Sequence, residues 1–465
     1  MSTFSGLNTV TTALWAQRRG LDVTGQNIAN VNTDGYSRQR VDLQSMGGTA
    51  VPAFFSTSRA TAGGVSADDV IRIRDTFLES RAHTEYAKTA RLTIESKAYE
   101  MVEQALREPG DTGIQSQLSD MWAAWGDVAN HPTDPAARSQ LLQRTETLVS
   151  GFQAARSSLD AQWTQAQENL VALVDEVNAV AGDIAKLNEA IRRATQDGKS
   201  ANELADKRDV LVLKLADQVG ATVRPAEDGV LNVLVGGVTL VTGAAATKLA
   251  VQGAVQPDDA LTDMPRIVTV PGGTNVTPGG TAQGQITVLT DIVPTSRAAL
   301  DEVAQKLVAQ VNAVHKTGVD LAGALGLDLL GPLPAGTVTA ATIRLNPAIG
   351  PEQIAASSLP NSTDAEIADR IANLGTLPGS PDSVYRDFIV ALGVEAAVSF
   401  RNLGIQSEIT TNVDAARESV AGVNLDEEMS NMLQFQHAYS AAARMVTAID
   451  ETLDVLINRT GLVGR

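Results

Sequence analysis

The side chains that could perform acid–base or metal chemistry are few and scattered along the chain. His83, His131, His315 and His437 stand far apart in the sequence. None of them has a second histidine or a carboxylate at the spacing of a metal-binding helix such as HExxH. We therefore interpret each histidine as an ordinary surface or core residue.

Other patterns that carry chemistry are also missing. Asp206 and Asp209 lie near Arg208 at helical spacing, which is typical of surface ion pairs. Glycine pairs near positions 236, 272 and 279 separate β-rich runs and indicate hairpin turns, and no Walker loop or GxSxG elbow is present. With no cysteine there is no thiolate site. The sequence predicts no catalytic, cofactor-binding or metal-binding residue, and hence no enzyme.

Composition narrows the possible partners. The 465 residues carry a net charge of −18, which argues against binding to nucleic acid or to an anionic membrane surface. The chain contains no uninterrupted apolar run near the roughly 18 residues of a membrane span, so no membrane insertion is expected. Its N-terminus lacks the basic and apolar regions of a cleaved signal peptide. If this protein leaves the cell, we expect a route without such a peptide.

The last long helix, predicted from Leu425 to about Ile457, organises the rest of the chain. Asn424 can cap its start, and three acidic residues follow in the first turn. Apolar residues alternate at steps of four and three, once Gln436 and Asp450 are allowed as polar interruptions, which predicts one coiled-coil seam. The predicted seam residues are Leu425, Met429, Met432, Tyr439, Ala443, Val446, Leu453 and Ile457.

The N-terminal segment has a matching pattern. Its predicted seam is interrupted by Gln17 and Thr24 and consists of Leu7, Val10, Leu14, Leu21, Ile28 and Val31. Residues 1–40 contain four basic and two acidic residues, whereas residues 424–465 contain three basic and six acidic ones, which weakly favours pairing of the two ends. The alternative is two ordinary amphipathic helices in separate parts of a globular core.

The middle of the chain contains two kinds of segment, which differ in the spacing of their apolar residues. A near-heptad stripe over residues 136–195 predicts a rod-like helix, and short β-rich runs with Gly-rich turns follow over 222–289. We predict a mainly α fold with an inserted small all-β module. The predicted domains are an assembly domain of 1–50 with 422–465, an elongated helical bundle of 51–220 with 296–421, and a β domain of 221–295.

Two terminal motifs carry a family resemblance. The run from Leu21 to Tyr36, LDVTGQNIANVNTDGY, resembles the N-terminal motif of bacterial flagellar rod, hook and hook-associated proteins. The C-terminal GVNLDEEM and LQFQHAYSA runs resemble the matching C-terminal motif, most closely that of the hook-associated protein 1 family. The interior runs NELADKRD and NAVHKTGVDLAG are also similar, so the resemblance covers both ends and parts of the middle.

The resemblance implies a structural subunit at the hook–filament junction. Such a subunit is extracellular, exported by the flagellar type III system without a cleaved signal, and polymerises into a ring or tube through its terminal helices. The implied partners are the hook subunit, the second hook–filament junction protein, and an export chaperone that holds the C-terminal region. The alternatives are another flagellar axial protein, such as a hook subunit or the second junction protein, or an enzyme on a flagellar scaffold.

The resemblance also assigns residues to the assembly interface. Asn27, Asn30, Asn32, Gly35 and Tyr36 are expected to close the first helix and shape the turn below the seam. A chaperone could cover the apolar surface formed by Met429, Met432, Leu433, Phe435 and Tyr439. The β insertion is short, so a larger outer domain of some relatives is expected to be missing.

Overall fold

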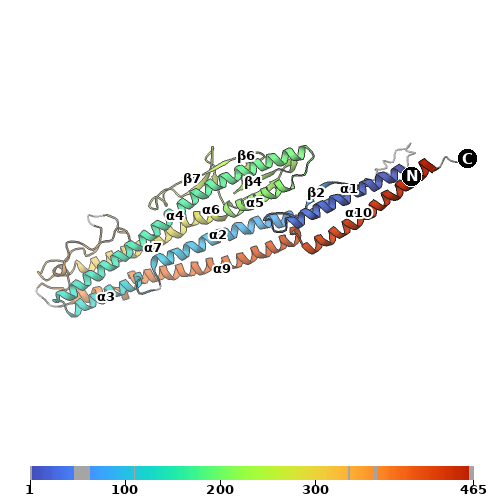
Figure 1. Ribbon diagram of the computed structural model, residues 1–465. Coiled ribbons are helices and arrows are strands. Elements are labelled where there is room, and N and C mark those ends of the chain that lie inside the picture. Colours follow the sequence, from blue (N-terminus) through green and yellow to red (C-terminus); the bar gives the residue numbers. More distant parts are fainter. Residues whose placement is uncertain are drawn as a thin grey trace, which may run out of the picture.

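The computed structural model describes residues 3–46, 63–108, 110–332, 336–360, 362 and 364–459. The molecule is long and mainly helical, with both ends of the chain at one tip (Figure 1). A pair of helices forms that tip, and a bundle of longer helices, with small sheets along one side, forms the rest (Figure 1). The predicted fold class is thereby confirmed.

The tip is built from the two ends of the chain. Helix α1 (Thr3–Ala29) lies alongside helix α10 (Leu425–Asp454), which continues into a π-helical turn, Val455–Arg459. Strands β1 (Gln39–Ser45) and β2 (Val65–Arg72) form an antiparallel pair against α1. The side chain of Asn424 accepts hydrogen bonds from the first turn of α10, as predicted for its cap. A Gly-, Thr- and Ser-rich stretch over residues 47–64 has the composition of a linker, and its residues 47–62 lie outside the described residues.

The bundle is centred on α4, a helix of 62 residues that Asp134 caps and Pro135 begins. It buries a stripe that includes Phe152 and Trp163, both 0% exposed, and the Trp163 indole N–H donates to the carbonyl of Leu289 at 2.9 Å. The bundle helices are α2 (Thr76–Leu106), α3 (Ile114–Asn130), α4 (Pro135–Gln196), α5 (Asn202–Val219), α6 (Gly280–Thr287), α7 (Val293–His315), α8 (Glu366–Ala372) and α9 (Pro381–Ala421), with a π-helical turn, Val288–Ile292, joining α6 to α7.

The β module consists of two small antiparallel sheets beside α4. Gly236 and Gly237 both have positive φ and close the hairpin between β4 and β5. One sheet has the order β3-β4-β5-β6 and the other β7-β8-β9. The strands are β3 (Thr222–Pro225), β4 (Leu231–Val235), β5 (Val238–Thr242), β6 (Ala245–Ala246), β7 (Lys248–Gln252), β8 (Arg266–Val270) and β9 (Asn275–Val276).

Three predictions of local structure were wrong. Residues 285–289 are helical, because the small residues of α6 pack closely on α2: a Cβ at Gly284 would lie 2.8 Å from Ile94. Residues 71–72 end strand β2, and the helix expected from Ile71 begins only after the Asp75 cap. The strand considered at 337–345 is reduced, in the described residues, to a single bridge between Leu330 and Leu345.

The irregular segment after α7 is organised by buried polar side chains. His315 is fully buried, with Nδ1 2.7 Å from the carbonyl of Leu327, and its Nε2 accepts the N–H of Ala355 at 2.9 Å. The accepting role of Nε2 fixes the tautomer, so Nδ1 is the donor. Arg138, 1% exposed, donates to the carbonyl of Ile354 at 2.7 Å. These groups replace the hydrogen bonds that regular structure would supply.

Candidate assembly site at the terminal helix pair

The two terminal helices pair antiparallel with a seven-residue repeat. Asn27 bonds Glu428, a Cβ at Gly20 would lie 2.6 Å from the ring of Phe435, and one at Gly6 would lie 3.8 Å from Ile449. Each step of seven along α1 thus matches a step of seven back along α10. Small residues on α1 let the helices approach closely, and Phe435 fills the space above Gly20.

These contact positions differ by one residue from the predicted seam of α1. Leu7, Leu14, Leu21 and Ile28 each follow a contact position and are half-buried on its flank, and Val31 is half-buried beyond the helix end. Val10 is buried. The contacts between α1 and α10 thus repeat every seven residues and lie one residue before the predicted leucine stripe of α1, whose role in assembly stays a prediction.

The predicted residues of α10 divide into two groups. Met432, Phe435, Val446 and Leu453 are half-buried. A second group is exposed: Leu425 45%, Met429 58%, Leu433 54%, Tyr439 40% and Ile457 72%. The only buried residues of α10 are Glu428 and Ala442. Most of the predicted interface on α10 is thus uncovered in the single chain, and its role in assembly stays a prediction.

A polar centre lies where α1 meets the strands and α10. The Asn27 amide, 1% exposed, donates to the carbonyl of Gln39 at 2.9 Å and to Glu428 Oε2 at 3.0 Å. Its oxygen accepts the Tyr36 hydroxyl at 2.8 Å and the Gln39 N–H at 3.0 Å. All four hydrogen-bonding positions of this asparagine are therefore used, and no other side chain of similar size offers the same set.

The carboxylate of Glu428, near the C-terminal end of the chain, is held by two side chains from the N-terminal part, Asn27 and Arg38. It is 2% exposed and also accepts the Nε–H of Arg38 at 2.8 Å, while the Nη1 of the same arginine reaches Glu427. Burial, and then the nearby acids Asp206 and Glu428, raise the pKa of Tyr36 to about 12, so its hydroxyl stays a donor at neutral pH. We call Asn27, Tyr36, Arg38, Gln39 and Glu428 the polar hub.

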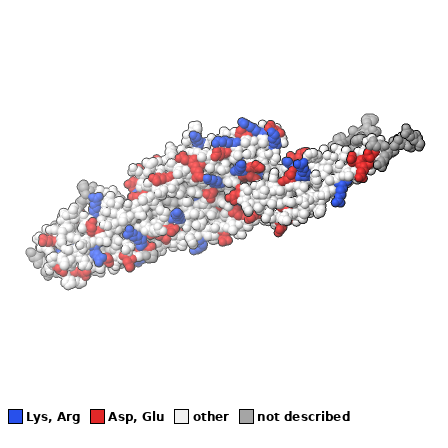
Figure 2. All heavy atoms as spheres, in the orientation of Figure 1, with Lys and Arg blue, Asp and Glu red and all other residues white. Residues whose placement is uncertain are grey.

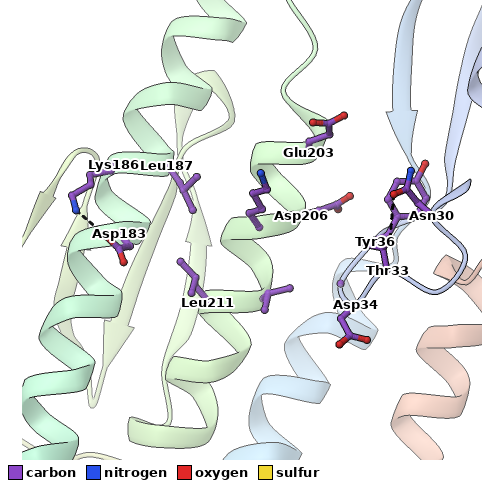
Figure 3. A pocket seen from close by; sticks show the side chains of 13 residues that line it. Asn30, Thr33, Asp34, Tyr36, Asp183, Lys186, Leu187, Glu203, Asp206 and Leu211 are labelled. Atoms are coloured by element: carbon purple, nitrogen blue, oxygen red, sulfur yellow. Dashed lines mark hydrogen bonds and ion pairs between the residues drawn. The ribbon is translucent and has the colours of Figure 1, made fainter. Parts of the chain in front are cut away.

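The turn below the hub needs its glycine. Gly35 has φ +77°, and a Cβ there would lie 2.2 Å from Val210 on α5. Asn30 closes the helix by donating to the carbonyl of Gln26 at 2.9 Å, and Asn32 is exposed. Beside this turn a cleft of about 760 Å³ opens toward α4 and α5, where Leu187 and Leu211 line it (Figure 3).

Ionic contacts fasten this tip to the bundle. Ser37 donates to Asp206 at 2.8 Å, and Arg72 of β2 reaches Asp206 at 2.9 Å and Asp209 at 2.7 Å. The interpretation of Asp206, Arg208 and Asp209 as a surface ion pair was wrong. Asp206 and Arg208 are buried, and Arg208 donates to the carbonyl of Gly229.

Sequence reasoning missed the roles of Ser37, Arg38 and Gln39 in the hub and its ties to the bundle. Their partners lie up to 390 positions away in the chain, so no local spacing could have indicated them. A buried glutamate among acidic residues at a helix start is likewise not visible in the sequence, because each of those acids is equally suited to the helix dipole.

Metal and membrane chemistry find little support in the described part of the chain. No group of three or more His, Asp or Glu residues there is arranged to hold a metal ion. One helical stretch, Glu366–Ile457, contains an 18-residue window of mean hydropathy 1.5 that is long and apolar enough to cross a membrane, which is weak evidence by itself. Only 11% of that window is buried.

Three family descriptions match separate parts of the chain. "Flagellar hook-associated protein FlgK helical domain" matches residues 99–330. "Flagella basal body rod protein" matches residues 7–36, and "Flagellar basal body rod FlgEFG protein C-terminal" matches residues 416–459. The two rod descriptions thus fall on the helices that pair at the tip.

Relatives match along the whole chain. Flagellar hook-associated protein 1 of Bacillus subtilis (strain 168) is 29% identical, with all of both chains covered. The protein of the same name from Escherichia coli (strain K12) is 23% identical, covering 97% of this chain and 99% of its own. A solved structure of the flagellar hook junction protein FlgK from Burkholderia pseudomallei superposes with a TM-score of 0.63 at 16% identity, covering 74% of this chain and 100% of that one. The last likeness concerns the fold alone.

Proposed function

Because the chain belongs to the flagellar hook-associated protein 1 family, a structural family of the hook–filament junction, we propose that it polymerises there through its paired terminal helices. The observation that supports this most is the pairing of α1 with α10 through the polar hub, at the two segments that resemble rod proteins. A pair with so little of α10 buried gains stability when neighbouring subunits cover it.

We propose that the exposed apolar residues of α10 have two successive partners. Before export, a chaperone covers the C-terminal surface around Met429, Leu433 and Tyr439. After export in the unfolded state through the flagellar type III system, without a cleaved signal, the same residues meet neighbouring subunits. The hook subunit lies on one side of the ring and the second junction protein on the other.

We further propose a three-part division of the chain. Residues 1–50 with 422–465 form the assembly domain, residues 51–220 with 296–421 the bundle, and residues 221–295 an outward-facing β domain. The position of α6 supports including residues 280–295 with the bundle, because Gly284 packs against Ile94 of α2.

Deletion of the gene tests the proposal. Cells that lack this chain should carry hooks without filaments, and a plasmid copy should restore the filaments. Normal filaments in the deletion strain would refute the junction role. Absence of hooks as well would instead favour the alternative, another axial protein such as a hook subunit.

A truncation tests the assembly route. Removal of residues 429–465 should abolish complementation, while the bundle keeps its cooperative helical unfolding transition. A truncated chain that restores filaments would refute polymerisation through the paired ends.

A further inference from the structure

Helix α9 has exposed apolar residues beside the face that it buries. One face is buried against the bundle at every seventh residue, including Leu392, Ser399 and Gln406. Outside this buried row, and at least about 100° around the helix from it, α9 carries Val390, Val394, Val398 and Ile405, which are 61%, 56%, 41% and 56% exposed. We call these four residues the outer face of α9. A row of large exposed apolar side chains on one helix is typical of a surface that a partner covers.

The outer face of α9 lies in a stretch of balanced charge. Residues 388–405 contain two charged side chains, Glu395 and Arg401, of opposite sign. The whole chain has a net charge of −18, so copies of it repel one another over most of their surface. Charged residues are spread over much of the visible face of the bundle (Figure 2). A neighbouring copy that covered this stretch would meet no net charge there, so the contact would add no like-charge repulsion.

The direction of this face indicates how a neighbour would lie. Helix α9 runs along the long axis of the molecule (Figure 1). A copy standing side by side would cover the face over its length, whereas a molecule stacked end to end would touch only the tips. Exposed apolar residues continue past α9 onto α10 at Leu425, Met429 and Leu433, within the segment matched to rod proteins.

We propose that the outer face of α9 is a lateral contact between two copies of this chain in the assembled ring. This inference rests on the proposed function, because a ring supplies the neighbouring copy. The balanced charge and the lengthwise direction favour a second copy over a membrane surface, since the stretch has no cluster of basic residues to attract anionic lipid.

Site-directed crosslinking tests the contact directly. The natural chain has no cysteine, so a single introduced thiol carries a maleimide–benzophenone photocrosslinker without competing reactions. Val394→Cys and Val398→Cys label the outer face, and Val171→Cys, at 39% exposure on α4, is the matched control. In flagella complemented with these variants, we expect illumination to give a crosslinked dimer of about twice 48.7 kDa from the outer face, about tenfold above the control.

The outcomes separate the two proposals. A complementing Val394→Cys chain that crosslinks to a different flagellar protein, to lipid or to nothing overturns the lateral contact and leaves the proposed function intact. Failure of the unmodified chain to complement overturns the function itself. As a second variant, Val394→Asp with Val398→Asp should lower the number of filaments about tenfold, whereas Val171→Asp should change it less than about twofold. Equal effects of the two would also overturn the contact.

Discussion

The molecule contains two antiparallel helix pairs of similar design, α2 with α9 in the bundle and α1 with α10 at the tip. In the first, Glu79, Tyr86 and Thr89 of α2 bond residues of α9, and a layer of further helices covers α2 from behind. The second pair has the strands β1 and β2 on one flank of α1, and within the described residues α10 packs mainly on α1, its own last turn and the hub.

This difference shows that two helices can pair without burying many large side chains, so the pairing alone does not make that region stable. Helix α4 buries a row of large side chains along its whole length, whereas α10 buries a carboxylate and one alanine. Since each large apolar side chain contributes about 1.5–3 kcal/mol when fully buried, the bundle gains far more stability from its own packing than the tip does. A structural subunit that must polymerise only in place benefits from such an arrangement.

Hydrogen exchange on the purified chain tests the comparison most directly. We expect amides of residues 425–454 to exchange about a thousandfold faster than those of residues 141–191, because local opening of the tip costs far less than opening of the bundle. Mass spectrometry of exchanged peptides measures both regions in one sample. Equal protection would mean that the tip is already stable in the monomer.

A core substitution should affect the bundle and leave the tip unchanged. Trp163→Ala removes a fully buried indole and its hydrogen bond to Leu289, so we expect a loss of about 3–5 kcal/mol in the free energy of unfolding. Urea titration followed by circular dichroism measures it. Phe435→Ala changes a half-buried residue of the tip, so it should alter the free energy of unfolding by less than about 0.5 kcal/mol in the same urea titration. A loss as large as that of Trp163→Ala would contradict the difference between bundle and tip.

Loss of the hub asparagine should impair assembly. Asn27→Ala deprives the buried Glu428 of one donor and leaves the Gln39 backbone without its partner, at a cost of about 1–3 kcal/mol. We expect at least about tenfold fewer filaments in a complemented deletion strain. The matched control is Asn30→Ala, whose amide bonds only within its own helix end. If both variants assemble equally well, the hub has no role in the pairing.

Acid should weaken the bundle through its buried histidines. Burial lowers the pKa of His315 below its usual 6.5, so the unfolded chain binds a proton that the folded chain does not. The free energy of unfolding should therefore be constant above about pH 6.5 and fall below it by up to about 1.4 kcal/mol per pH unit for each such histidine. Burial lowers the pKa of His83 too, so His83→Gln should reduce the slope. A pH-independent urea midpoint would refute this.

Two glycines of α1 allow the smallest test. A Cβ at Gly20 would collide with the Phe435 ring, whereas one at Gly25 would meet nothing within 4 Å. Gly25→Ala should stabilise helix α1 by about 0.5–1 kcal/mol. Gly20→Ala should give no such stabilisation, because the added Cβ would displace α10. Exchange rates of α1 amides in assembled flagella measure the two variants side by side. The same sign of effect in both would argue against close packing at Gly20.

Much of the fold followed from local patterns. Capping residues and Gly/Pro turns fix where helices and hairpins begin and end, so Asn202–Val219 and the β4–β5 hairpin were predictable from short windows. The strand predicted at 285–289 failed because this short run, Gln-Ile-Thr-Val-Leu, suits either a strand or a segment of buried helix. Close packing of α6 on α2, through Gly284, decided between them.

In the candidate site, too, some features follow from the local sequence and others only from the tertiary structure. The sequence by itself determined the heptad period of the terminal helices, the glycine at position 35 and the asparagines of the turn, because period and turn chemistry are local. The phase of the contact was decided by the tertiary structure. Both flanks of α1 carry apolar residues, and Gly20 lets α10 approach one residue away from the leucine stripe. Only folding brings Arg38, Asp206 and Glu428 to the same place, since their partners are far apart in the chain.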